Sequence, residues 1–139
     1  MMVHFEKTGE LCVRNEVTEW HQEHGWIWNV RDDGGRLLGV FYCTLLCGDG
    51  CVIHFETLGG VPRWAFAAAA RKAVRMLEPV CGVIYATIPS RFGKLIAVMR
   101  RFGFRVVEGG GFRRDGDAVE LLKYFGDEGR YITGNGGAK

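Results

Sequence analysis

The chain has 139 residues, of which 47% are apolar and 24% are charged, and its formal net charge at pH 7 is +2. This length fits one domain with its own buried core. The charge balance lacks the basic excess of a nucleic-acid-binding protein, and no apolar run approaches the roughly 20 residues of a membrane span. Five cysteines, together with a start that does not read as a signal sequence, predict a reduced, cytoplasmic protein.

The first elements in chain order are a short strand at residues 3–5 and a helix at residues 11–24. Gly25 is a suitable residue to end this helix. The face that it would bury carries side chains at helical spacing, namely Val13, Val17, Trp20 and His24.

Three strands follow, at residues 26–30, 37–46 and 51–58. They are separated by two glycine-rich segments, Asp32-Asp33-Gly34-Gly35 and Cys47-Gly48-Asp49-Gly50, whose residues favour tight turns. Two tight turns between three strands predict an antiparallel meander.

After Gly59-Gly60-Val61-Pro62 the apolar period changes to that of a helix, which runs to about Glu78 and stops at Pro79. The apolar face of this helix consists of Phe66, Ala70, Ala73, Val74 and Leu77.

The last third of the chain predicts a buried strand at residues 80–88 and a second helix that Ser90 caps and Gly103 ends. Strands at residues 104–107 and 118–125 follow, separated by a loop at residues 109–116. We therefore predict a single α/β (α+β) domain over residues 1–126 and a flexible Gly-rich tail at residues 127–139.

The order of these elements over residues 3–125 resembles the GNAT acetyltransferase superfamily. A sharper likeness is local: Ile88-Pro89-Ser90 is followed by Ala97-Val98-Met99-Arg100-Arg101-Phe102-Gly103-Phe104, which looks like the GNAT segment where a helix leads through a Gly-Phe pair into a strand. The resemblance implies a GNAT-like acyl-CoA N-acyltransferase fold, with a mixed central sheet, an antiparallel meander and flanking helices. It also implies an acetyl-CoA-dependent N-acetyltransferase that acts on an amine by direct attack.

In that family the strand before the main helix splays from its neighbour and pairs with the pantetheine arm, and the loop after it binds the pyrophosphate. By resemblance, the cofactor contacts here would be Thr57, Leu58, Gly59, Gly60, Arg63, Trp64, Ala65 and Ser90. The loop departs from the family pattern, because Pro62 removes one N–H and the bulky Trp64 stands beside Arg63.

The candidate catalytic residues are Glu56 as general base and Tyr85 as general acid. Glu56 and His54 alternate with apolar residues and share one face of the strand that would carry the acetyl group; His54 fits a packed residue better than a base. Many family members place a Tyr where this chain has Met99, and a thioether cannot donate a proton. Tyr124 is a second strand tyrosine that could serve as the acid.

Other groups of reactive residues favour structural roles. The series Cys43, Cys47, Cys51 and His54 lacks metal-site spacing and predicts buried thiols and no metal. His21 and His24 predict a surface pair. The arginines favour a solvated face, with the adenosine phosphate of coenzyme A or an acidic partner as the alternative: Arg100, Arg101, Arg105, Arg113 and Arg114. Core packing is the first interpretation of Trp20, Trp26 and Trp28, and a substrate groove is the second.

Two functions remain open at this point. One is the acetyltransferase, with acetyl-CoA as co-substrate and an unknown amine as acceptor, without a membrane or nucleic-acid partner. The other is a non-catalytic GNAT-like binding or structural protein of the kind that phage and prophage genomes carry, which the divergent loop and Met99 favour. Either could form a homodimer.

Overall fold

The N-terminal half of the chain forms four strands, of which the last three are the predicted meander. The four strands are β1 (Val3–Glu6), β2 (Trp26–Asp32), β3 (Leu37–Leu45) and β4 (Gly50–Thr57), each antiparallel to the next. The computed structural model describes residues 2–7, 9–46, 48 and 50–126. The predicted tail and Cys47 therefore lie outside the described residues.

The second half adds two helices and four strands. They are α2 (Arg63–Leu77), β5 (Val83–Pro89), α3 (Gly93–Arg101), β6 (Phe104–Val106), β7 (Phe112–Arg114) and β8 (Asp117–Tyr124). The strand predicted at residues 80–88 starts later, because the N–H groups of Val80 and Cys81 both donate to the carbonyl of Leu77 and form a turn after α2. The segment predicted as a loop contains β7, which forms a hairpin with β8.

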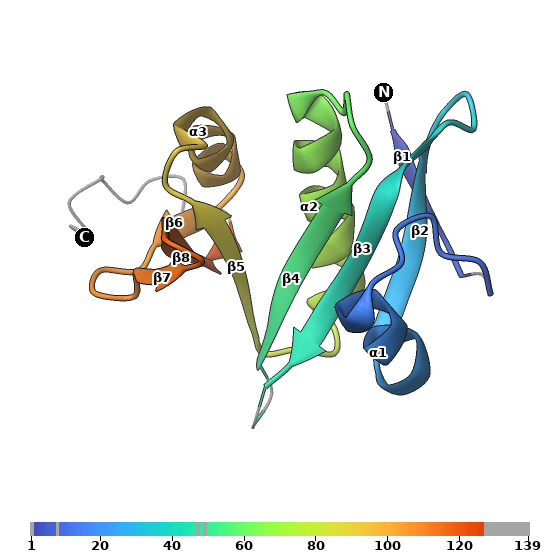
Figure 1. Ribbon diagram of the computed structural model, residues 1–139. Coiled ribbons are helices and arrows are strands. Elements are labelled where there is room, and N and C mark those ends of the chain that lie inside the picture. Colours follow the sequence, from blue (N-terminus) through green and yellow to red (C-terminus); the bar gives the residue numbers. More distant parts are fainter. Residues whose placement is uncertain (1, 8, 47, 49, 127–139) are drawn as a thin grey trace.

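The eight strands of the described residues belong to one sheet, which is mixed as predicted, and β7 is the strand that the prediction lacked. The order is β1-β2-β3-β4-β5-β8-β6, with β7 also paired to β8, and only β4 and β5 run parallel. Figure 1 shows that β4 and β5 meet at one end and diverge toward the other, so that the sheet opens between its two halves.

Helix α1 (Glu16–His24) is shorter than predicted and buries a different face. Asn15 caps it: the side chain of Asn15 accepts hydrogen bonds from the N–H groups of Val17 and Thr18, and Thr18 Oγ1 accepts one from the N–H of Asn15. Thr18 and His21 are the buried residues, whereas Val17 and Trp20 are about half exposed. Apolar spacing alone indicated the wrong face because the buried positions of this helix are polar and hydrogen-bonded.

The two faces of the sheet carry separate cores. The larger core joins the sheet to α2 and α3 and includes Phe41, Ile53 and Leu77. The smaller one lies on the opposite face, where α1 packs, and includes Tyr42 and Val40. Among the residues that the structure describes, no helix is both long and apolar enough to cross a membrane.

Candidate active site

The divergence of β4 and β5 creates an opening in the sheet. Pairing between the two strands ends at Ile53 and Ala86, whereas the rest of β5 pairs with β8 alone. Beyond Ile53, β4 is bonded only to β3. The last residues of both strands therefore line a gap, as the GNAT resemblance implies for the acetyl-CoA strand.

Backbone donors of β4 face this gap. The N–H of Leu58 donates to Leu38 on β3, and in an antiparallel ladder alternate residues direct their N–H and C=O groups to the same neighbour. The intervening residues, Phe55 and Thr57, therefore direct their N–H and C=O groups to the side where β5 has moved away. These groups are in position to pair with an extended ligand.

A cavity of about 330 Å³ lies in the gap, and side chains from both faces of the sheet line it. The lining on the α2 and α3 face is apolar and consists of Phe41, Ile53, Phe55, Phe66, Ala70, Ala86, Ile88, Leu95 and Met99. The lining on the α1 face is more polar, because it comes from the alternate residues of the same strands and includes Tyr42, His54, Glu56 and Thr87. Phe92, Pro89 and Arg114 complete it. The cavity therefore joins an apolar entrance to a polar one.

Glu56 is held at the polar entrance by two neighbouring elements. Its Oε2 accepts a 2.8 Å hydrogen bond from the hydroxyl of Tyr42 on β3, and its Oε1 accepts one of 3.3 Å from Nδ2 of Asn15. Asn15 is the cap of α1, so the start of that helix also positions the carboxylate. Burial, followed by the hydrogen bond to Glu56, raises the pKa of Tyr42 well above its ordinary value of 10, so Tyr42 remains a donor.

His54 belongs to a chain of side chains behind the cavity. Its Nε2 lies 3.3 Å from Thr44 Oγ1, which lies 3.2 Å from Nε2 of His21, and Nδ1 of His21 lies 2.8 Å from the carbonyl of Val17. That carbonyl can only accept, so Nδ1 of His21 carries hydrogen. In the tautomer in which Nε2 of His21 accepts, the Thr44 hydroxyl donates to it and accepts from Nε2 of His54. This arrangement leaves Nδ1 of His54 as an acceptor.

Burial, followed by the positive charge of Arg114 and the electrostatic interaction with the His21 ring, lowers the pKa of His54 to about 4. His54 is therefore neutral at pH 7. The same chain corrects the prediction of a surface pair, because His21 is buried while His24 is exposed.

Two further polar groups line the cavity from outside the meander. Thr87 lies on β5, and its Oγ1 is buried without a hydrogen-bond partner among the described residues. Arg114 lies on β7 and stacks on the ring of Phe112, with Cζ 5.4 Å from the ring centroid. Buried hydroxyls are nearly always hydrogen-bonded, so Thr87 fits a group that pairs with a bound ligand.

Neither of the two candidate acids lines the cavity. Met99 is buried and lines it, at the place where the resemblance implies a Tyr. Neither Tyr85 nor Tyr124 is among the lining residues. Tyr124 packs on Phe104 and borders a separate cavity beside α2.

The predicted pyrophosphate loop lies between the opened end of β4 and the start of α2. Gly59 and Gly60 are exposed, Gly60 has a φ of +76°, and its carbonyl accepts a 3.4 Å hydrogen bond from Arg36. No side chain caps α2, and its first turn contains no acidic residue. Arg63 is exposed, and neither it nor the half-buried Trp64 lines the cavity. The bulk of Trp64 therefore leaves the cavity open.

Ser90 does not cap α3, contrary to the prediction. The N-cap is Phe92, and the Ser90 hydroxyl instead donates a 3.2 Å hydrogen bond to Glu120 on β8. The N–H of Ser90 donates to Ala118 on the same strand. The antiparallel partner of β5 therefore engages Ser90 before the helix begins.

The remaining predictions have mixed outcomes. Cys43 and Cys51 are buried thiols on the α2 face, as predicted, and His54 lies on the opposite face. No cluster of potential metal ligands occurs within the described residues. Arg105 is buried, so the arginines do not form one solvated face.

The tryptophans lie outside the cavity lining. Trp26 and Trp28 pack against the larger core, as the first interpretation of these residues proposed. Trp20 is about half exposed on α1 and contacts the rings of His21 and His24. A substrate groove formed by the tryptophans is therefore not what the structure contains.

Comparison with known proteins identifies the fold as that of the GNAT acetyltransferases. Similar structures include a GNAT family acetyltransferase from Elizabethkingia anophelis with acetyl-CoA bound (TM-score 0.62, 9% identity, 88% of this chain and 96% of the other). A chimera of spermidine N-acetyltransferase SpeG from Vibrio cholerae and hSSAT is also similar (0.58, 14%, 84% and 76%). So is a GNAT family acetyltransferase from Bacillus anthracis (0.54, 14%, 78% and 70%). No family model and no curated protein sequence matches the chain.

Proposed function

We propose that the protein is an acetyl-CoA-dependent N-acetyltransferase that transfers the acetyl group directly to a primary amine. The observation that carries this proposal is the cavity through the opened sheet, with unpaired β4 backbone on one side and a held carboxylate at the polar entrance. The likeness of the fold to an acetyltransferase structure with acetyl-CoA bound supports it.

In this proposal acetyl-CoA enters by the apolar side, next to α2. Its pantetheine arm pairs with the free groups of Phe55 and Thr57, and its pyrophosphate lies at Leu58, Gly59 and Gly60. The uncapped start of α2 adds the positive end of a helix, to which Arg63 contributes charge and Trp64 contributes its backbone N–H. The N–H of Ala65 donates to the carbonyl of Pro62, so Ala65 contributes only its small side chain. Ser90 stands at the end of β5, across the opening. The N–H of Phe55 also suits the oxyanion that forms on the acetyl carbonyl.

The acceptor enters by the polar side, and Glu56 takes the first proton from its ammonium group. The freed nitrogen attacks the acetyl carbon, the C–S bond breaks, and the departing thiolate takes the second amine proton. Glu56 and the thiolate together accept both amine protons. The reaction therefore needs no phenol at position 99, and neither Tyr85 nor Tyr124 is needed as an acid. Neutral His54 adds an acceptor beside the amine without adding a charge that would repel it.

The test is N-acetylated product, detected by mass spectrometry, from acetyl-CoA and pooled primary amines. We expect Glu56→Gln to lower kcat/KM about 100-fold or more and to leave acetyl-CoA affinity within about twofold, because the base acts only on the amine. Glu23→Gln, the same change at an exposed position on α1, is the matched control. Full activity of the Glu56 variant would overturn the role of this carboxylate.

A binding protein that holds acetyl-CoA without transferring acetyl is the second candidate. The observation that favours it is Met99 in the cavity wall, at the place where the resemblance implies a Tyr, because a thioether cannot donate a proton to a departing thiolate. It predicts acetyl-CoA binding without product for every amine tested, whereas the enzyme predicts both.

A further inference from the structure

The polar entrance of the cavity carries one negative and one positive group. Four titratable side chains line it, and two of them, Tyr42 and His54, are neutral at pH 7. The charges that remain are the carboxylate of Glu56 on β4 and the guanidinium of Arg114 on β7. They reach the cavity from opposite halves of the opened sheet.

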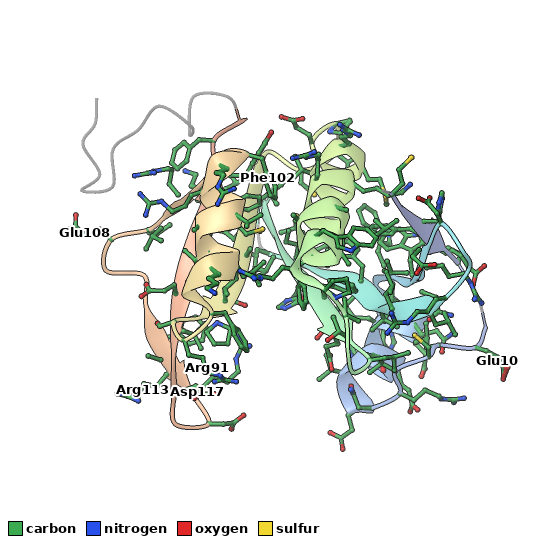
Figure 2. All side chains as sticks on the ribbon, turned by 90° about the horizontal axis from the view of Figure 1, so that it is seen from above. Glu10, Arg91, Phe102, Glu108, Arg113 and Asp117 are labelled. Carbon is green, nitrogen blue, oxygen red and sulfur yellow. The ribbon has the colours of Figure 1, made fainter. Side chains whose placement is uncertain are left out.

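Arg114 faces the cavity without a carboxylate of its own. None of the ion pairs among the described residues includes it, and its guanidinium stacks on the ring of Phe112. Near the turn of the same hairpin, Asp117 pairs with Arg91 (Figure 2), and Asp115 forms none of the ion pairs among the described residues. A guanidinium with free donors at the edge of a ligand cavity is suited to a carboxylate, which it can bind through two parallel hydrogen bonds.

The hydroxyl of Thr87 adds a neutral donor on the strand that separates these two charges. In the sheet, β5 lies between β4, which carries Glu56, and β8, to which β7 is paired. Thr87 Oγ1 is buried and has no partner among the described residues. Its place in the wall suits a second hydrogen bond to an anionic group that Arg114 holds.

We propose that the acceptor is a small amino-carboxylate, whose ammonium group binds Glu56 and whose carboxylate binds Arg114. This inference rests on the proposed acetyl transfer and names its substrate class. A polyamine fits the site less well, because the lining offers one carboxylate to several ammonium groups and places Arg114 against them. The acceptor of this protein therefore differs in class from spermidine, the substrate named for one protein of the same fold.

The experiment compares the twenty standard amino acids with their carboxamides as acceptors, and includes spermidine. Each pair differs only in the negative charge that Arg114 would bind. We expect the best acceptor to be an amino acid, with kcat/KM at least tenfold above that of its own amide. Arg114→Gln lowers that value at least tenfold and reduces the ratio of kcat/KM for the amino acid to that for its own amide to about twofold or less.

Arg113→Gln is the matched control, because it removes the same charge from the same strand. Neighbouring residues of a strand point to opposite faces, and Figure 2 shows Arg113 projecting away from the body of the protein. We expect this variant to keep the preference for the carboxylate. An equal loss in both variants would indicate a general effect of charge or of hairpin stability and would overturn the assignment.

The binding of acetyl-CoA, measured separately by calorimetry, distinguishes failure of the proposed substrate class from failure of the proposed acetyl transfer. If acetyl-CoA binds and amides or spermidine are the preferred acceptors, the substrate class is wrong and the proposed transfer stands. If acetyl-CoA binds and no amino acid is acetylated, the substrate class is also wrong. If acetyl-CoA does not bind, the proposed function fails and this inference fails with it.

Discussion

His54 should make the stability of the protein depend on pH in a window that its environment sets. Burial, Arg114 and His21 lower its pKa from the ordinary 6.5 to about 4 in the folded protein. Between these two values the unfolded chain binds a proton on this imidazole that the folded protein does not bind. The unfolded state therefore gains stability as the pH falls, and the contribution of His54 is destabilising below pH 6.5 and absent above it.

The size of the effect follows from the difference in pKa. One unit corresponds to about 1.4 kcal/mol, so His54 should remove about 1.4 kcal/mol at pH 5.5 and about 2–3 kcal/mol at pH 4.5 from the free energy of unfolding. His54→Gln removes the titration and keeps an amide N–H that can donate to Thr44. We therefore expect wild type to lose that much more stability than the variant between pH 7.5 and pH 4.5.

The assay is urea unfolding of both proteins at pH 7.5, 5.5 and 4.5, followed by tryptophan fluorescence. The two proteins differ only at residue 54, so the difference between them isolates the contribution of this side chain and of its interactions. If the gap between wild type and variant stays the same at all three pH values, His54 is not a buried neutral group, and the tautomer argument for Nδ1 fails with it.

Three further predictions concern the strand and the loop around the cavity. Gly39→Ala would place Cβ 2.1 Å from the carbonyl oxygen of Glu56, so the free energy of unfolding should fall by about 3 kcal/mol or more in urea titration; wild-type stability would contradict the close approach of β3 and β4. Tyr42→Phe removes a donor from the Glu56 carboxylate and should cost about 1–2 kcal/mol of stability and about tenfold in kcat/KM, whereas unchanged kinetics would show that this hydrogen bond does not position the base. Arg63→Glu should weaken acetyl-CoA binding at least tenfold in calorimetry, and Arg75→Glu, an exposed change further along the same helix, should not; equal affinities of the two variants would remove Arg63 from the pyrophosphate site.

The meander and both later helices can be predicted from the sequence because their signals are local. Glycine-rich turns separate alternating strands, and Gly103, with a φ of +117°, ends the segment of α3 as the pattern indicates. The prediction that Ser90 caps α3 was wrong because its hydroxyl donates to Glu120, a residue 30 positions away in the sequence. The buried face of α1 was predicted wrongly because the residues buried there, Thr18 and His21, are polar.

The candidate site was only partly predictable, since it depends on strand register and on contacts between distant segments. Glu56 is identifiable from alternation within β4. Its hydrogen bond from Tyr42 requires the register of the β3–β4 hairpin, which counting from the glycine-rich turn would have approximated. Thr87 and Arg114 carry no local signal, because each becomes part of the cavity only through the opening of the sheet and the β7–β8 hairpin.

The most direct test of the central claim is a calorimetric titration of the purified protein with acetyl-CoA, with desulfo-CoA as the control for thiol exchange at the cysteines. A cavity with unpaired β4 backbone and an uncapped α2 beside it predicts binding of both ligands at micromolar affinity. No heat and no thermal shift at millimolar concentrations of either ligand would contradict the account.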